Sequence, residues 1–167
     1  MNRTPRVVPL IALLSVVAAV AVFAPQASAA DPRVMRALNE EGLKYEVDDD
    51  GDYMVVMSWE EDGRSHLVFV NSQVEVMGGE EIREVWAVAF RSSQPSIPGK
   101  LAIRLLEENS KFKIGAWEMG SNENGVRVHF TARVPTTAGS AFLHEVIDAV
   151  SVTADEMEKE LLGTDEL

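Results

Sequence analysis

The sequence contains no cysteine. This absence excludes disulfide bonds, zinc sites with thiolate ligands and enzymes that use a thiol nucleophile. A lipid anchor attached to a cysteine is excluded for the same reason. The hydrophobic core alone must therefore hold the fold, which is feasible because a chain of this length buries about two thirds of its unfolded surface.

Basic residues are also scarce. Lys and Arg together number 15 against 27 Asp and Glu, which gives a formal net charge of −12. A domain with this charge repels the phosphate backbone of nucleic acids and the surface of anionic membranes, so neither is expected as a partner. A basic protein partner or a metal cation is compatible with the charge.

A long apolar run lies at the start of the chain. Two arginines precede the run 7–23, and the small residues Ala27-Ser28-Ala29 follow it. This order is typical of a secretory signal peptide, so we predict that residues 1–29 are removed and that the protein is periplasmic or extracellular. A retained membrane anchor is the alternative, but a spanning helix needs about 20 apolar residues. Cleavage after Ala29 would leave 13 basic and 27 acidic residues and a net charge of −14.

Turn and capping residues divide the remaining chain into eight predicted elements. Asp31-Pro32 is typical of a helix start, and Asp62-Gly63 and Asn124-Gly125 are typical of hairpin turns. The predicted elements are a helix over 31–42, strands over 53–59, 65–71 and 85–90, a helix over 96–109, strands over 112–119 and 126–135, and a helix over 136–162.

The order α-β-β-β-α-β-β-α predicts one α+β domain over residues 30–163. Strands joined by hairpins form antiparallel sheets, so we expect an antiparallel sheet of about five strands with three helices packed on one face. Residues 164–167 are predicted to be a frayed tail.

Two predicted strands, 53–59 and 85–90, are apolar on both faces. Because three helices of this size cover only one face of a sheet, the second face needs another cover, either a second subunit or a client segment. We therefore predict a homodimer or a protein or peptide partner. The aromatic residues predicted to bind it, with core packing as the competing role, are Trp59, Trp86, Phe90 and Trp117.

The element order and several short phrases resemble the YbjN family, whose fold is similar to that of the type III secretion chaperones. The phrases are Asp50-Gly51-Asp52, Asp62-Gly63-Arg64, Leu105-Leu106-Glu107-Glu108-Asn109, Gly115-Ala116-Trp117-Glu118 and Ala154-Asp155-Glu156-Met157-Glu158. The resemblance covers residues 31–163 and implies a sensory or regulatory role. The chaperones are homodimers that hold an extended client segment, but they are cytosolic, whereas this chain has a predicted export signal.

Metal sites are not expected from the sequence. Glu46, Asp48 and Asp50 mimic the start of a calcium-binding EF-hand loop, but the twelfth position of that loop holds Met57 in place of glutamate. The three histidines, His66, His129 and His144, lie on different elements without the spacing of a zinc site, and we predict that they are on the surface.

No motif for catalysis or phosphate binding is evident. The sequence lacks a Gly-x-Ser-x-Gly nucleophile elbow and a glycine-rich phosphate loop. We therefore predict an exported, non-catalytic protein-binding, chaperone-like or regulatory module without a cofactor. The alternatives are a small-molecule sensor or enzyme of the cell envelope, which would need a concave polar pocket, or a divalent-cation binder.

Overall fold

The computed structural model describes residues 29–167. The predicted signal peptide therefore lies outside the described residues, except for Ala29. Within the described part, no helix is long and apolar enough to span a membrane.

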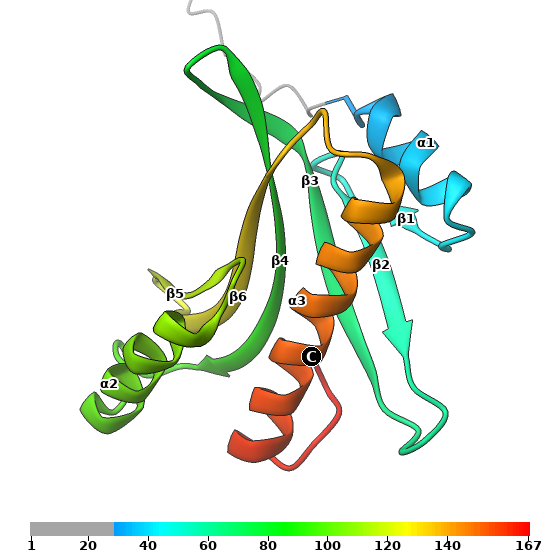
Figure 1. Cartoon of the computed structure of the whole chain (residues 1–167). Coiled ribbons are helices and arrows are strands. Elements are labelled where there is room, and N and C mark those ends of the chain that lie inside the picture. Colours follow the sequence, from blue (N-terminus) through cyan, green and yellow to red (C-terminus); the bar gives the residue numbers. More distant parts are fainter. Residues whose placement is uncertain (1–28) are drawn as a thin grey trace, which may run out of the picture.

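The fold is α+β, as predicted, with three helices and an antiparallel sheet (Figure 1). The sheet has six strands in place of about five, because a two-residue strand precedes the first predicted one. In chain order the elements are α1 (Pro32–Glu40), β1 (Glu46–Val47), β2 (Tyr53–Ser58), β3 (Ser65–Met77), β4 (Glu80–Ser92), α2 (Gly99–Glu108), the 3₁₀ turn η1 (Asn109–Lys111), β5 (Ala116–Asn122), β6 (Gly125–Pro135) and α3 (Ser140–Leu161).

The strands are arranged in the order β1-β2-β3-β4-β6-β5, and every pair is antiparallel. β3 and β4 are each 13 residues long, about twice the predicted length. The chain reverses between them at Gly78 and Gly79, whose φ angles are 62° and 92°. Glycine suits this tight turn because it adopts positive φ without steric cost.

Two helices start later than predicted. α2 begins at Gly99, after Pro98, where a start near Ser96 was expected. α3 begins at Ser140, because Thr136 is used elsewhere: its backbone N–H donates to the Glu81 carbonyl at 2.8 Å, and the following residues form a turn closed by Ala138 and Pro135. The Thr136 hydroxyl also bonds Arg33 and Glu81, so it does not cap the helix.

The helices and one face of the sheet form a single hydrophobic core. Along β4, Val85 and Ala87 alternate with outward-facing residues and are fully buried. α3 lies across β3, β4 and β6 (Figure 1), and Val146, Ile147 and Val150 on its inner side are buried. α1 and α2 add further residues to the same core, namely Val34, Leu38 and Leu105. The three helices therefore share one face of the sheet, as the sequence predicted.

The two edges of the sheet differ. β5 forms one edge over its seven residues. At the other edge β1 pairs only with Tyr53 and Met54 of β2, so residues 55–58 of β2 have no strand on their outer side within the described residues. Unpaired backbone groups of this kind are a template for the addition of another strand.

Candidate functional site

The face of the sheet opposite the helices carries a row of apolar side chains. We define the bare sheet face by Met54, Val56, Leu67, Phe69 and Trp86. Met54 of β2 is paired with Phe69 of β3, and Phe69 is paired with Trp86 of β4, so these three side chains form one line across three strands. No helix of the described chain packs over this row.

Trp86 is held in place on the bare sheet face by contacts that include Phe69, Asn71 and Arg127. Its ring stacks on Phe69, with centroids 4.4 Å apart and planes inclined by 12°. Its Nε1–H donates to the Asn71 side-chain carbonyl at 2.8 Å, and the Arg127 guanidinium lies 4.6 Å from the ring centroid. A cation over an aromatic face is a favourable contact, so Trp86 is fixed in orientation while remaining partly exposed.

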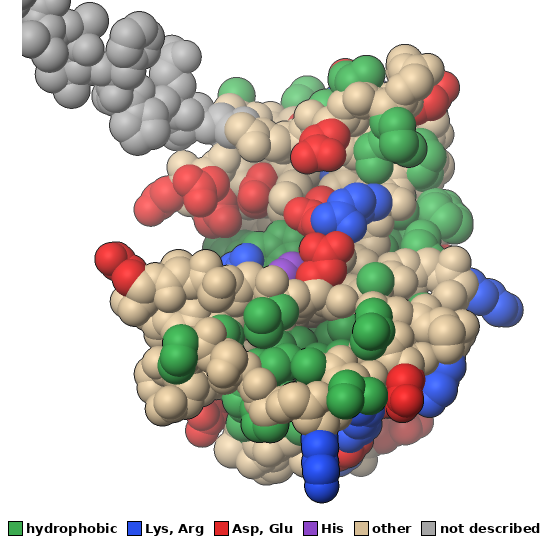
Figure 2. All heavy atoms as spheres, turned by 90° about the vertical axis from the view of Figure 1, so that its left-hand side faces the viewer, with side chains coloured by type: hydrophobic (Ala, Val, Ile, Leu, Met, Phe, Trp, Pro, Cys, Tyr) green, Lys and Arg blue, Asp and Glu red, His purple; other side chains and the backbone are tan. Residues whose placement is uncertain are grey.

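Beyond Trp86 the same face of the sheet becomes polar. Arg133 of β6 forms ion pairs with Glu84 at 2.9 Å and with Glu118 at 2.7 Å. Figure 2, which views the side of the molecule that carries β5 and β6, shows acidic and basic side chains near a histidine and hydrophobic side chains in a hollow below them. On the outer face of the sheet, the apolar row that ends at Trp86 is therefore followed by a charged region made of Glu84, Arg133 and Glu118.

A groove lies where the bare sheet face meets the edge formed by β1 and β2. This β2 groove has a volume of about 840 Å³ and is lined by Asn39, Leu43, Lys44, Tyr45, Glu46, Met54, Val56 and Leu67. Val56 is 63% exposed in its wall. The groove therefore lies beside the stretch of β2 whose outer side has no strand partner.

The four aromatic residues predicted to bind a partner do not lie together. Only Trp86 is on the bare sheet face. Trp117 is buried in the core, where its ring packs edge-to-face on Phe130. Phe90 also packs against the core. A bulge between Val88 and Phe90 shifts the strand alternation and pairs Phe90 with the buried Val128.

Trp59 is also separate from Trp86. It follows the end of β2 and lines a shallow depression with Val152 and Lys159 of α3, on the helix side of the sheet. The structure therefore removes Phe90 and Trp117 from the predicted binding surface and places Trp59 on a different face.

The prediction of surface histidines is wrong for two of the three. His66 and His129 are 1% and 9% exposed, and burial lowers the pKa of each imidazole from its ordinary value. His144 is partly exposed, with its Nδ1 3.3 Å from Glu41. The alternation of β3 explains the burial of His66, because Val68 and Val70 lie on the same side of the strand and are fully buried.

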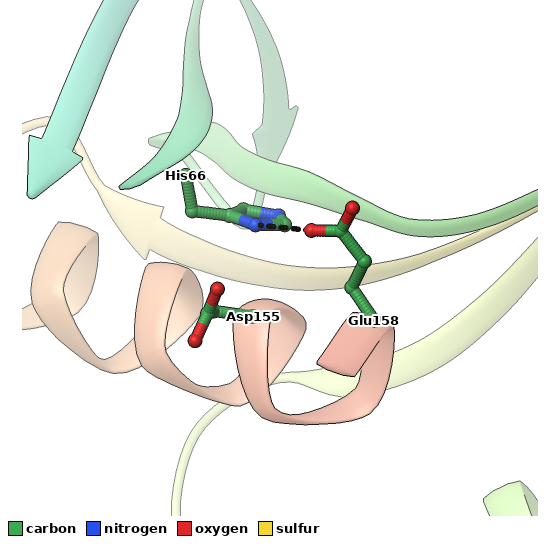
Figure 3. A group of neighbouring side chains, drawn as sticks. All are labelled: His66, Asp155 and Glu158. Carbon is green, nitrogen blue, oxygen red and sulfur yellow. Dashed lines mark ion pairs between the residues drawn. The ribbon is translucent and has the colours of Figure 1, made fainter. Parts of the chain in front are cut away.

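His66 lies beside two acidic residues of α3 (Figure 3). Asp155 and Glu158 are three residues apart and therefore lie on one side of the helix. One ligand atom from each of the three side chains lies within 4.8 Å of the others. Glu158 is fully buried, and its Oε2 is 3.4 Å from His66 Nδ1.

Arg64 connects this cluster to the C-terminal tail. Its guanidinium bonds Asp155 Oδ1 at 2.7 Å and lies 3.4 Å from Glu158 and 3.8 Å from Asp165. It also donates to the Thr164 carbonyl at 2.7 Å, and the Glu166 backbone N–H donates to Glu158 Oε1 at 2.8 Å. The tail is therefore hydrogen-bonded to the domain and is not frayed as predicted.

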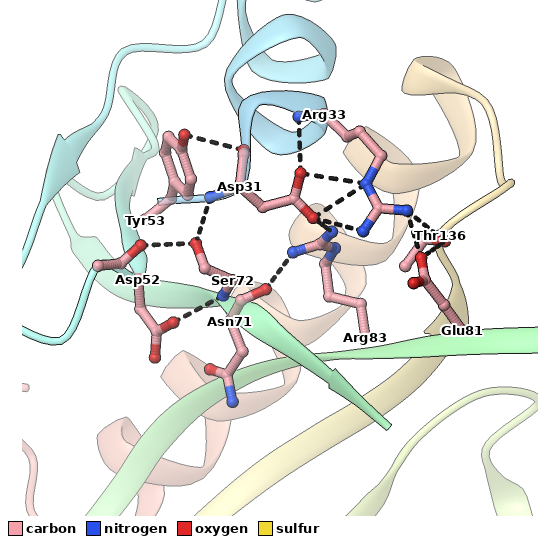
Figure 4. Close-up of polar contacts among 10 residues, drawn as sticks. Asp31, Arg33, Asp52, Tyr53, Asn71, Ser72, Glu81, Arg83 and Thr136 are labelled. Atoms are coloured by element: carbon pink, nitrogen blue, oxygen red, sulfur yellow. Dashed lines mark hydrogen bonds and ion pairs between the residues drawn. The ribbon is translucent and has the colours of Figure 1, made fainter. Parts of the chain in front are cut away.

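A second polar network ties the start of α1 to the sheet (Figure 4). The Asp31 carboxylate accepts hydrogen bonds from Arg33 and, at 2.5 Å, from the buried Arg83. The Asp31 backbone N–H donates to Ser72 Oγ at 2.9 Å. Burial acts to raise the pKa of Asp31, but the hydrogen bonds from Arg33 and Arg83 outweigh it and hold the pKa well below its usual range.

The acidic turn before β2 satisfies its own backbone. Asp48 Oδ1 accepts hydrogen bonds from the backbone N–H groups of Asp50 and Asp52 at 3.0 and 2.9 Å. This is the local bonding of an Asx turn. The turn prediction from composition is confirmed, and the aspartates have a structural role in it.

A scan against protein-family models and a search among curated proteins found no match to this chain. The resemblance to the YbjN family therefore stays a prediction. The functional argument depends on the geometry of the described residues.

Proposed function

We propose that this chain is an exported, non-catalytic protein-binding module and that the β2 groove binds an extended peptide segment. The observation that carries the proposal is the location of the bare sheet face beside the free edge of β2. Backbone donors and acceptors and an apolar surface are both offered there, and these are the two features that a strand-adding peptide requires.

In this mode the bound segment pairs with residues 55–58 of β2 as an additional strand. Main-chain hydrogen bonds then provide affinity, and alternate side chains of the peptide contact Met54 and Val56. The groove volume of about 840 Å³ provides space for such side chains. Removal of the exposed Val56 and the partly exposed Met54 from water favours the complex.

Charge selects the class of partner. The net charge of −12 attracts cationic partners and repels acidic ones. The groove itself holds one acidic and one basic residue, Glu46 and Lys44, so the overall field of the protein sets the preference. We therefore expect a segment in which apolar residues alternate with Lys or Arg.

Binding of synthetic decapeptides tests this proposal. A peptide of alternating valine and lysine should bind and should shift the backbone amide NMR signals of residues 54–58, whereas a valine–glutamate peptide should not. Val56→Asp should abolish binding. Val76→Asp is the matched control, because Val76 is 70% exposed on β3 and lies outside the groove.

Equal binding of the two peptides, or unchanged binding to Val56→Asp, would contradict the proposal. If the valine–lysine peptide binds without shifts at residues 54–58, strand addition at β2 is wrong. Equal binding of the two peptides would show that charge does not select the partner. The other two outcomes would show that the peptide does not bind at the β2 groove.

A second copy of the chain is the alternative occupant of the bare sheet face. The stacked Phe69 and Trp86 are partly exposed and favour such a contact, as does the frequency of twofold homodimers. Light scattering should then give twice the chain mass, and Trp86→Asp should reduce it to that of a monomer without unfolding. A monomeric wild-type protein would exclude this alternative.

A further inference from the structure

We propose that His66, Asp155 and Glu158 form a binding site for one divalent transition-metal ion of the zinc class. The site is on the helix side of the sheet, between β3 and the last turns of α3 (Figure 3). The site is separate from the β2 groove, so this proposal does not depend on whether the groove binds a peptide.

The orientation of the His66 ring is the first argument. Its Nε2 lies 2.8 Å from the Val88 backbone carbonyl, which can only accept a hydrogen bond, so Nε2 carries the proton. In the neutral ring with this proton on Nε2, Nδ1 presents a lone pair. It is fully buried, has no hydrogen-bond partner in the described residues and faces Glu158. Metal-binding histidines are commonly oriented in this way, with the second ring nitrogen donating to a carbonyl.

The spacing of the ligand atoms is the second argument. Two ligands of a tetrahedral zinc ion, each about 2.0–2.1 Å from the metal, are roughly 3.3 Å apart. His66 Nδ1 and Glu158 Oε2 are 3.4 Å apart. The group of three spans up to 4.8 Å, so a small rotation of the Asp155 side chain completes the set. Three protein ligands leave the fourth position of the ion for water.

A shortage of positive charge is the third argument. Three carboxylates, of Asp155, Glu158 and Asp165, face the single guanidinium of Arg64. Asp165 is exposed to solvent, whereas Asp155 and Glu158 are buried, so the buried part of the group has two carboxylates for one guanidinium. Uncompensated charge is costly to bury, and Glu158 is fully buried. A bound cation supplies further positive charge at this point.

The nature of the ligands selects the ion. Calcium prefers six to eight oxygen ligands, whereas an imidazole nitrogen with two carboxylates suits zinc and its transition-metal neighbours. Arg64 approaches Asp155 through Oδ1, so the other carboxylate oxygen is not used in this ion pair. The tail residues Thr164 and Glu166 are bonded to Arg64 and Glu158, so the tail lies beside the site.

Equilibrium dialysis and thermal unfolding with ZnCl₂ test the site. We expect one zinc per chain and a higher unfolding midpoint, because a ligand that binds only the folded state stabilises it. CaCl₂ at the same concentration should leave the midpoint unchanged. His66→Gln should weaken zinc binding by more than about tenfold. His144→Gln is the matched control, because His144 is partly exposed on the same helix as Asp155, and it should bind zinc as the wild type does.

A measurement on the wild-type protein covers the case in which His66→Gln does not fold. Zinc should shift the ¹⁵N NMR signal of His66 Nδ1 and leave the signals of His129 and His144 in place. A stoichiometry unaffected by His66→Gln, an equal response to calcium, or an unchanged His66 signal at saturating zinc would each overturn the proposal.

Discussion

Phe69 and Trp86 stack face to face across β3 and β4, with ring centroids 4.4 Å apart, on the side of the sheet opposite the helices. In contrast, Trp117 lies in the core on β5, with 7% of its surface exposed. Two tryptophans on neighbouring parts of one sheet therefore have different surroundings, and each supports a different prediction for its replacement.

Replacement of each tryptophan by alanine should reduce the stability of the domain by a different amount, because Trp86 is on the sheet surface and Trp117 is in the core. Trp117→Ala should cost about 3–5 kcal/mol, because it leaves a cavity against Phe130. Trp86→Ala removes mainly the stack on Phe69 and should cost about 1 kcal/mol. Denaturant unfolding of both variants measures the difference. Equal losses would show that the bare sheet face is packed like the core.

The ionised Asp31 should stabilise the domain at neutral pH. Asp31→Asn keeps an acceptor for the Arg33 backbone N–H but leaves the buried Arg83 without its carboxylate, so we expect a loss of about 3 kcal/mol at pH 7. Urea unfolding measures this loss. Asp49→Asn, in the exposed acidic turn, is the control and should change stability by less than about 0.5 kcal/mol.

The same pair of proteins should differ in its response to acid. The folded pKa of Asp31 lies below the unfolded value, so its contribution is fully present above that unfolded value of about 3.9. It is lost as the pH falls toward the folded pKa. The stability difference between wild type and Asp31→Asn should therefore shrink below about pH 4. A difference that grew in acid would show that the carboxylate is not the stabilising group.

Two glycines with positive φ should tolerate alanine differently. At Gly125, with φ of 120°, an added Cβ would lie 2.0 Å from the Ser92 carbonyl oxygen. Gly125→Ala should therefore cost about 3 kcal/mol or more, through both strain and a backbone clash. At Gly63, with φ of 72°, nothing lies within 4 Å, and Gly63→Ala should cost about 1 kcal/mol. Thermal unfolding of the two variants compares these costs.

Deletion of residues 164–167 should destabilise the domain by about 2 kcal/mol, because hydrogen bonds to the charged Arg64 and Glu158 are lost. Glu166→Ala is the control, since it keeps the backbone N–H that donates to Glu158 and should have an effect below about 0.5 kcal/mol. Urea midpoints of the two proteins provide the test. A deletion without effect would restore the original prediction of a frayed tail.

Residue pattern and turn chemistry were sufficient to predict the fold class and the helices on one face. The alternating buried residues of β4 and the glycine turns carried this information. The sequence analysis missed the continuation of β3 past residue 71 and the start of β4 before residue 85. Residues 72–73 and 80–81 are polar, but the alternation of Val74 and Val76 with Glu75 was a usable signal for the longer β3. Asn124-Gly125 marked a real hairpin, but its loop residues are 123 and 124, and Gly125 is already in β6.

The candidate sites were harder to predict than the fold. The bulge before Phe90 reverses the side of the strand on which this residue lies, and no feature of the residues 85–90 indicates it. His66 and Glu158 are 92 positions apart, and only tertiary packing brings them together. The alternation of His66 with Val68 and Val70 was a usable signal for the burial of this histidine. No pattern in the sequence indicated that Asp155 and Glu158 would lie beside it.

Arg64 and its acidic partners are also far apart in the order in which the chain is synthesised. It belongs to the turn between β2 and β3, whereas its acidic partners lie at positions 155, 158 and 165. A growing chain therefore holds this guanidinium without these counter-charges until α3 and residue 165 have been added. The packing of α3 against this end of β3 must form late, after about a hundred further residues have followed Arg64.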